Sequence, residues 1–198
     1  MNTESLSAGL ILASSSKYRT MLLERLGIPF ECLSPDIDET RQDAESPLDL
    51  VSRLAMEKAR SVSWMKPRSV VIGSDQIAVF DGRIIGKPGD AKKATAQLMS
   101  FSGQAVEFLT AVSVQCLDSN FAALHVDTTG VGFRNLHADE IKRYLEIEKP
   151  FDCAGAFKAE SLGITLFDYI RSEDPTALIG LPLIRTASML RHSGLRLP

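Results

Sequence analysis

The sequence predicts an α/β fold: a mixed, elongated and twisted sheet with flanking helices and two lobes around a cleft. Short apolar runs that suit buried strands alternate with longer stretches in which apolar residues recur at helical spacing. Two long strand-like segments, residues 104–117 and 121–133, follow each other and predict an antiparallel hairpin. A length of 198 residues suits one domain with a sizeable core, so we expect residues 1–198 to form a single unit.

Composition narrows the range of functions. The chain is 44% hydrophobic and 24% charged, as in ordinary globular proteins, and no apolar run approaches the ~20 residues that span a bilayer. Residues 1–9 lack the basic start of a secretory signal. The three cysteines match neither a metal motif nor a disulfide framework, so we expect reduced thiols in a cytoplasmic protein. The net charge of -3 argues against nucleic-acid binding but permits a small phosphorylated ligand in one cleft.

The first elements are predicted to be a strand, a polar loop and a helix. Residues 9–13 form an apolar run, residues 14–16 are serines, and residues 17–26 have helical spacing and end at a Gly-x-Pro stop signal. A helix N-terminus offers free N–H groups and a positive dipole, which suit phosphate. A merely capped helix explains the serines equally well.

An acidic loop follows the next predicted strand, residues 30–34. Carboxylates at Asp36, Asp38 and Glu39 repel one another unless a cation or lysine neutralises them; alternatively they are solvated turn residues. The next helix is expected from Ser46, as N-cap, to about residue 64. It carries Lys58, which either points into a cleft or is simply solvated.

The centre of the chain is a predicted hairpin that brings an acid and a lysine together. A buried strand starts at Val70, breaks at Gly73-Ser74, presents Asp75 and resumes as a second strand. An Asp-Gly turn follows, and the return strand delivers Lys87. We expect this hairpin to form the centre of a nucleotide-hydrolysing site.

Further helices, strands and turns are expected on both sides of the long hairpin. They are a helix over residues 90–99, a helix from 137 to before Pro150, a strand over 164–170, a turn or short helix at 174–175, a closing helix over 182–190 and a polar tail over 191–198.

Hydrolysis of a phosphoanhydride needs cations and N–H donors for the phosphates, a base for the water and commonly a divalent ion held by carboxylates. The chain offers Ser14 and Arg19 at a helix start, Lys58 and Lys87 as point charges, and Asp75 and Glu39 as acids. It has no Walker sequence, no dinucleotide fingerprint and no G-x-S-x-G context. Spacing alone does not show that the six residues converge.

Six short blocks occur in order along nearly the whole chain. They are Leu12-Ala13-Ser14-Ser15-Ser16 with Arg19, Asp38-Glu39-Thr40, Glu57-Lys58-Ala59, Gly73-Ser74-Asp75-Gln76, Gly86-Lys87-Pro88 and Gly180-Leu181-Pro182. Together they resemble the Maf family of nucleoside triphosphate pyrophosphatases. One departure is visible: Lys17 stands where the family often has Pro.

The resemblance implies a fold related to the inosine triphosphate pyrophosphatases, a divalent metal (Mg, Mn or Co) and cleavage between the α and β phosphates. It makes Asp75 the general base or a metal-bound acid and Glu39 a metal or water ligand. Ser14, Arg19, Lys58 and Lys87 become phosphate contacts. A homodimer is a further family expectation.

The resemblance also indicates which nucleobase the site accepts. Tyr18, Gln76 and Glu160 stand where members acting on dTTP and UTP carry Arg, Thr and Gln, and they resemble the subgroup acting on 7-methyl-GTP. N7 methylation makes guanine cationic, which an aromatic face attracts by roughly 0.5–2 kcal/mol, and a carboxylate accepts from both guanine N–H groups. Spacing alone favours a core role for Tyr18 and a solvated role for Glu160.

We therefore expect a pyrophosphatase that converts 7-methyl-GTP into 7-methyl-GMP and diphosphate. Two alternatives remain open: a dTTP/UTP pyrophosphatase, and a nucleotide-binding regulator of cell division that needs no turnover. Measuring which nucleoside triphosphates the protein hydrolyses distinguishes these possibilities.

Overall fold

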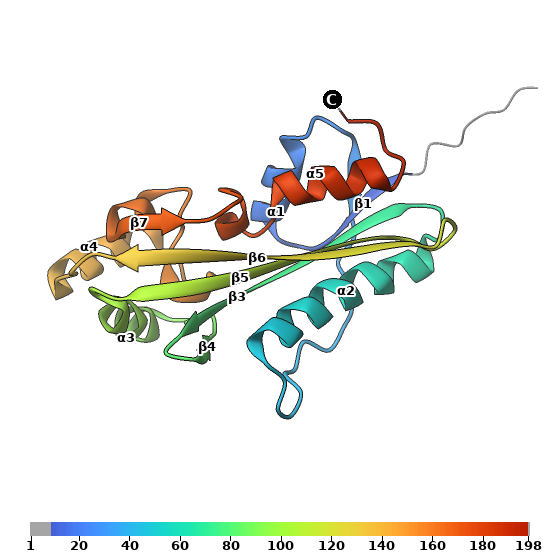
Figure 1. Cartoon of the computed structure of the whole chain (residues 1–198). Helices are drawn as coiled ribbons and strands as arrows, with labels where there is room; N and C mark the ends of the chain where they lie inside the picture. The colour runs from blue at the N-terminus through green and yellow to red at the C-terminus, as the bar shows by residue number, and fades with distance from the viewer. Residues whose placement is uncertain (1–8, 198) are drawn as a thin grey trace, which may run out of the picture.

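A seven-stranded twisted sheet runs the length of the molecule, with helices on both faces (Figure 1). The structure is a computed structural model and describes residues 9–197, so the expectation of no secretory signal in residues 1–9 falls almost wholly outside it. The strands are β1 (Leu10–Ala13), β2 (Phe30–Cys32), β3 (Val70–Phe80), β4 (Arg83–Ile85), β5 (Ala105–Cys116), β6 (Phe121–Phe133) and β7 (Phe167–Arg171). The helices are α1 (Lys17–Glu24), α2 (Pro47–Met65), α3 (Ala91–Phe101), α4 (Ala138–Glu148) and α5 (Leu183–His192), with short 3-10 turns at Ala154–Ala156, Leu162–Leu166 and Ala177–Ile179.

The sheet is mixed, as predicted. Its order is β2-β1-β3-β5-β6-β7, with β4 paired to β3 outside this path. Strand β1 runs parallel to β2 and β3, whereas the β3–β5, β5–β6 and β6–β7 pairs are antiparallel. The predicted long hairpin is β5 and β6, whose register pairs Cys116 with Phe121 and Ala105 with Gly132.

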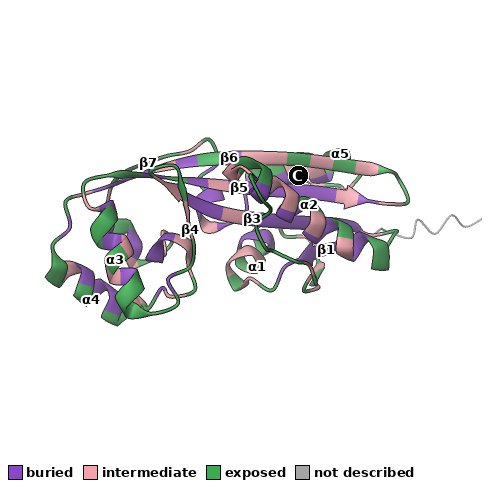
Figure 2. Cartoon of the chain, turned by 90° about the horizontal axis from the view of Figure 1, so that it is seen from below, coloured by how far each residue is buried: buried purple, intermediate pink, exposed green. Residues whose placement is uncertain are grey.

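The two largest hydrophobic cores lie at different places along the sheet, and two smaller clusters include residues of α2. One core lies at the α3 and α4 end and is rich in aromatic side chains, with Phe101, Phe108 and Phe133 buried among residues of both helices. The other lies under α1 and α5, where Leu12, Leu23 and other aliphatic residues pack on the sheet. In Figure 2, α3 and α4 lie at one end of the sheet, and α1 lies further along it. Helix α2 covers the opposite face of the sheet from α1 and α5 (Figure 1).

The predicted helix starts are confirmed by their caps. Ser16, Ser46 and Asp90 each accept a hydrogen bond from a backbone N–H in the first turn of α1, α2 and α3. Of the helices formed by residues 9–197, none has the length and apolar character needed to cross a bilayer.

The predicted break at Gly73-Ser74 is wrong, because β3 continues without interruption from Val70 to Phe80. Gly73 is needed for a different reason. A Cβ built on it would lie 2.5 Å from the backbone nitrogen of Ala59 and closer still to the carbonyl oxygen of Ala55, both in α2. Gly73 therefore lets the helix backbone approach the strand closely, which is a role of glycine inside strands.

The predicted strand over residues 164–170 is only half correct. Residues Leu162–Leu166 form a 3-10 turn, and β7 begins at Phe167. The Thr165 hydroxyl donates a 2.8 Å hydrogen bond to the Leu162 carbonyl, which closes the turn and competes with strand pairing.

Candidate active site

Two adjoining hollows form one cleft beside the N-terminus of α1. The larger has a volume of about 640 Å³ and the smaller about 140 Å³. They share lining residues from β3, from the α1 region and from the loops after β4 and α4, namely Ser16, Tyr18, Arg19, Gln76, Lys87, Asp152 and Ala154. The cleft therefore has a wide charged part and a narrower part that is partly aromatic.

Lys58, Asp75 and Glu39 meet in the wide part. Lys58 lies on α2 and is only 6% exposed. Its Nζ is 2.7 Å from Oδ1 of Asp75, on β3, and 2.7 Å from Oε1 of Glu39, in the loop before α2. A buried ammonium is costly without partners, so the two carboxylates explain how Lys58 is tolerated there. Burial alone would raise the pKa of Glu39, but the hydrogen bond and charge of Lys58, with Lys87 and Arg19, hold it below its usual value.

The start of α1 forms a wall with hydrogen-bond donors. The Ser14 hydroxyl is buried and accepts from the backbone N–H of Ser16 at 3.1 Å. Arg19 donates from Nε to the carbonyl of Gly180 at 2.9 Å and approaches Ser14 Oγ with Nη1 at 3.5 Å. A guanidinium has five N–H donors, so others remain for a ligand. Lys87 is exposed just after β4 and lines both hollows.

In the narrow part, Gln76 has a fixed orientation. Its side-chain Nε2 donates to the carbonyls of Ala177 and Leu178, each at 3.0 Å, and to the Thr110 hydroxyl at 2.9 Å. Backbone carbonyls only accept hydrogen bonds, so the amide nitrogen must face them. The amide oxygen has no hydrogen-bond partner among residues 9–197 and is therefore the atom of Gln76 available to a ligand.

Tyr18 and Glu160 line the same narrow part, beside Phe108 and Phe157. The ammonium of Lys17 lies 5.1 Å from the centroid of the Tyr18 ring, so the ring already takes part in a cation–π contact. The Tyr18 hydroxyl lies near the Cys153 thiol, at 3.9 Å from its sulfur.

The Maf-like protein family model matches residues 9–193. The chain belongs to the Maf family. Similar proteins named 7-methyl-GTP pyrophosphatase cover nearly the whole chain. One from Albidiferax ferrireducens is 48% identical over 194 residues, which are 98% of each chain. One from Vibrio parahaemolyticus is 50% identical over 185 residues, 93% of this chain and 95% of the relative, and one from Xanthomonas campestris is 53% identical over 189 residues, 96% and 98%.

The cleft of this Maf protein contains every site residue that the sequence predicted. Eight of them line the wide part: Ser14, Tyr18, Arg19, Glu39, Lys58, Asp75, Gln76 and Lys87. Glu160 lines the narrow part only. The structure brings them together from α1, α2, β3 and four loops.

Sequence reasoning gave no role to Thr110 or to the Gly180 carbonyl. Thr110 is fully buried, contacts Gln76 and donates to Ala177 at 3.0 Å. Its neighbours on the same face of β5, Phe108 and Val112, are buried and apolar. One hydroxyl inside an otherwise apolar alternating pattern was the available signal, because a buried hydroxyl needs a partner. The Gly180 carbonyl had no signal, because a backbone acceptor is not visible in a sequence.

The acids in the cleft are suitable oxygen ligands for a divalent metal. Residues 9–197 contain no group of three or more His, Cys, Asp or Glu side chains arranged to hold an ion. The Maf site instead offers Asp75 and Glu39, which share Lys58. Mg²⁺ commonly binds one or two carboxylates together with substrate phosphates and waters, so this donor set suits it.

Proposed function

We propose that this Maf protein hydrolyses 7-methyl-GTP to 7-methyl-GMP and diphosphate. The observation that carries the proposal is the joining of two chemically different parts in one cleft. A cluster of Lys58, Asp75 and Glu39 lies in one part, and Tyr18 lies beside Glu160 in the other. The names of relatives that match nearly the whole chain support the same substrate.

The proposed reaction is an attack of water on the α-phosphorus. The bond between that phosphorus and the α–β bridging oxygen breaks, and diphosphate leaves. We assign Asp75 to the water, either as the base that takes its proton or as a ligand of the metal. Arg19, Lys58 and Lys87, with Ser14, contact the phosphates and offset their charge. Asp75 and Glu39 would hold the divalent ion, which when bound polarises phosphoryl oxygens and offsets developing charge.

The narrow part accounts for the choice of base. The methylated guanine is cationic, and an aromatic face such as that of Tyr18 attracts cations. Guanine presents its N1–H and N2–H₂ donors on one edge. The Glu160 carboxylate and the Gln76 amide oxygen are acceptors in the same part of the cleft. Uracil and thymine have only one ring N–H donor, so they would leave one acceptor unpaired, which is costly when buried.

The decisive test is diphosphate release from a panel of canonical and N7-methylated triphosphates with Mg²⁺, Mn²⁺ or Co²⁺. We expect the highest kcat/KM with 7-methyl-GTP. The triple variant Tyr18→Arg, Gln76→Thr, Glu160→Gln should shift preference towards dTTP and UTP, and an unchanged ratio of rates would refute the assignment of the base. Faster turnover of dTTP or UTP by the wild type would favour the pyrimidine alternative. Tight binding without turnover would favour the regulator of cell division.

We place this activity in the cytoplasm. Cys32, Cys116 and Cys153 are all free thiols, which suits a reducing compartment. A homodimer is proposed from the family alone, and size-exclusion chromatography with light scattering tests it.

A further inference from the structure

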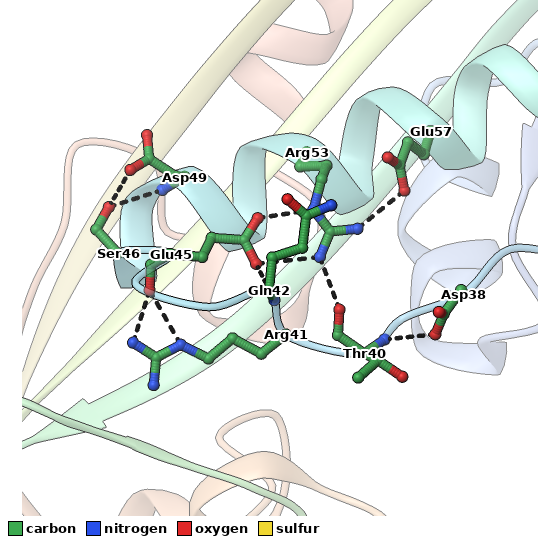
Figure 3. A network of polar contacts seen from close by, with 9 residues as sticks. All are labelled: Asp38, Thr40, Arg41, Gln42, Glu45, Ser46, Asp49, Arg53 and Glu57. Atoms are coloured by element: carbon green, nitrogen blue, oxygen red, sulfur yellow. Dashed lines mark hydrogen bonds and ion pairs between the residues drawn. The ribbon is translucent and has the colours of Figure 1, made fainter.

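Arg53, on α2, contacts several residues of the loop that carries Glu39 (Figure 3). Between β2 and α2 the chain has no helix or strand. Arg53, on α2, donates from Nη2 to the carbonyl of Thr40 at 3.0 Å. Thr40 directly follows Glu39, so Arg53 fixes the backbone next to a residue of the active site.

The same guanidinium also forms two ion pairs. Nε lies 2.7 Å from Oε1 of Glu45, and Nη2 lies 3.1 Å from Oε2. Nη1 donates to Glu57, four residues further along α2, at 3.0 Å. Bidentate pairs between a guanidinium and a carboxylate are among the strongest hydrogen bonds in proteins and restrict geometry.

Glu45 connects Arg53 to the other end of the loop. Its Oε2 also accepts from the backbone N–H of Gln42 at 3.0 Å, and its carbonyl accepts two hydrogen bonds from Arg41 (Figure 3). The loop is therefore held on both sides of a turn. The side chains of Arg53 and Glu45 are only 17% and 7% exposed, so solvent screens this pair less than a surface pair.

Helix α2 thus controls Glu39 at two points. Arg53 holds the backbone after it, and Lys58 holds its carboxylate at 2.7 Å. The two residues are five positions apart, a rise of about 7.5 Å along the helix. Because α2 also packs on β3 at Gly73, one rigid element sets the position of Glu39 relative to Asp75.

We propose that Arg53 is a positioning residue for hydrolysis, which acts by placing the Glu39 carboxylate opposite Asp75. Arg53 lines neither hollow of the cleft, so it acts through Glu39 rather than on the substrate. The inference rests on the proposed function only in assuming that Glu39 takes part in hydrolysis. Lysine cannot replace it, because a single ammonium cannot bind Glu45, Glu57 and the Thr40 carbonyl in a fixed plane.

A double-mutant cycle tests this role with the triphosphate that the wild type cleaves fastest, whichever it is. We expect Glu39→Gln and Arg53→Lys each to lower kcat/KM by about tenfold or more, since small misplacements in an active site are expensive. Combined, they should cost no more than Glu39→Gln alone. Additive losses would overturn the proposal, and so would a Glu39→Gln variant as active as the wild type. If the wild type does not hydrolyse 7-methyl-GTP, but the cycle gives the expected result with another triphosphate, then only the proposed substrate is wrong and the role of Arg53 stands.

Arg134 provides a matched control. It binds Glu140 with Nη1 and Nη2 at 3.2 and 3.0 Å and donates from Nε to the Thr165 carbonyl at 2.8 Å, outside the cleft. Arg134→Lys should leave kcat/KM unchanged. An equal loss in this variant would mean that Arg53 matters only for general stability.

Hydrogen exchange gives a readout that needs no turnover. Arg53→Lys should speed amide exchange across residues 37–45 by about tenfold, and Arg134→Lys should not. The same rates in the wild type and in Arg53→Lys would overturn the proposal, because the loop would then be held without Arg53.

Discussion

The ammonium of Lys58 lies 2.7 Å from the carboxylate of Asp75, and both side chains are almost completely buried. The pair joins the middle of α2 to the middle of β3, 17 positions apart in the sequence. Glu39 adds a second carboxylate on the same ammonium, and its side chain is 58% exposed. One buried cation therefore separates two acids that would otherwise repel each other across the cleft.

The first prediction separates the structural from the chemical role of this pair. Lys58→Met should lower the free energy of unfolding by about 3 kcal/mol, because it leaves Asp75 buried without its partner. Asp75→Asn should abolish diphosphate release yet keep most of the stability, since Lys58 retains Glu39. Adding Asp75→Asn to Lys58→Met should recover stability, as the orphaned charge is removed. Urea unfolding measures the free energy of unfolding of each variant. A double variant less stable than Lys58→Met would contradict the prediction.

The second prediction concerns the contact between α2 and β3. Gly73→Ala should destabilise the protein by about 3 kcal/mol, because its Cβ would overlap the backbone of α2 at Ala59 and Ala55. Gly130, on β6, is the control, because a Cβ there meets nothing within 4 Å. Gly130→Ala should change stability by less than about 1 kcal/mol. Equal thermal shifts in the two variants would show that the close approach is not needed.

Gly73 also shows what a sequence can reveal of this fold. The strands and helices followed from periodicity and caps, and Ser46 with Pro47 marked the start of α2 correctly. A glycine inside an apolar run predicts a break and a close backbone approach equally well. Helix α2 decides between the two, because its backbone at Ala55 and Ala59 lies against Gly73. This packing of the helix on the strand cannot be derived from local sequence patterns.

The site was predicted residue by residue from a resemblance and not from physics alone. Lys58 has the spacing of an ordinary helix residue, and only the fold shows that it is buried between Asp75 and Glu39. The role of Arg53 is not visible in the sequence, because its partner Glu45 precedes the helix and Thr40 offers only a backbone carbonyl. Long-range contacts to backbone atoms have no sequence signal.

The third prediction uses the cysteines as probes of the cleft. Burial, followed by the nearby Asp152, raises the pKa of the Cys153 thiol to about 11, whereas Cys32 is exposed. The thiolate is the reactive form, so iodoacetamide at pH 8 should label Cys32 well before Cys153. The rate at Cys153 should rise about tenfold per pH unit until the pH passes its pKa. Mass spectrometry of tryptic peptides follows both sites.

A bound nucleotide should slow labelling of Cys153, which lines the narrow part of the cleft, and should leave Cys32 unaffected. A non-hydrolysable triphosphate analogue is the probe. Faster labelling of Cys153 than Cys32 at pH 8, or equal protection of the two, would contradict this account.

The last prediction tests the orientation of the Gln76 amide. Gln76→Glu replaces the donor that faces the carbonyls of Ala177 and Leu178, both at 3.0 Å, with a group that is acceptor-only when ionised. The carboxyl of the variant should therefore have a raised pKa and be neutral at acidic pH, because the neutral acid restores one donor to the loop and one acceptor to the cleft. A raised folded pKa means that stability, relative to the wild type, is complete below the unfolded pKa, falls as the pH rises towards the folded pKa and stays lost above it.

We expect kcat/KM of Gln76→Glu to fall at neutral pH and to recover towards the wild-type value as the pH is lowered. Gln115→Glu is the matched control, since Gln115 also donates to a backbone carbonyl, that of Met56, but lies outside the cleft. Its variant should keep the wild-type pH profile for hydrolysis. A pH-independent loss in Gln76→Glu would mean that the amide does not present its oxygen to the base. Recovery of activity at acidic pH requires the neutral acid to replace two functions of the amide, that of a donor to the loop and that of an acceptor from guanine.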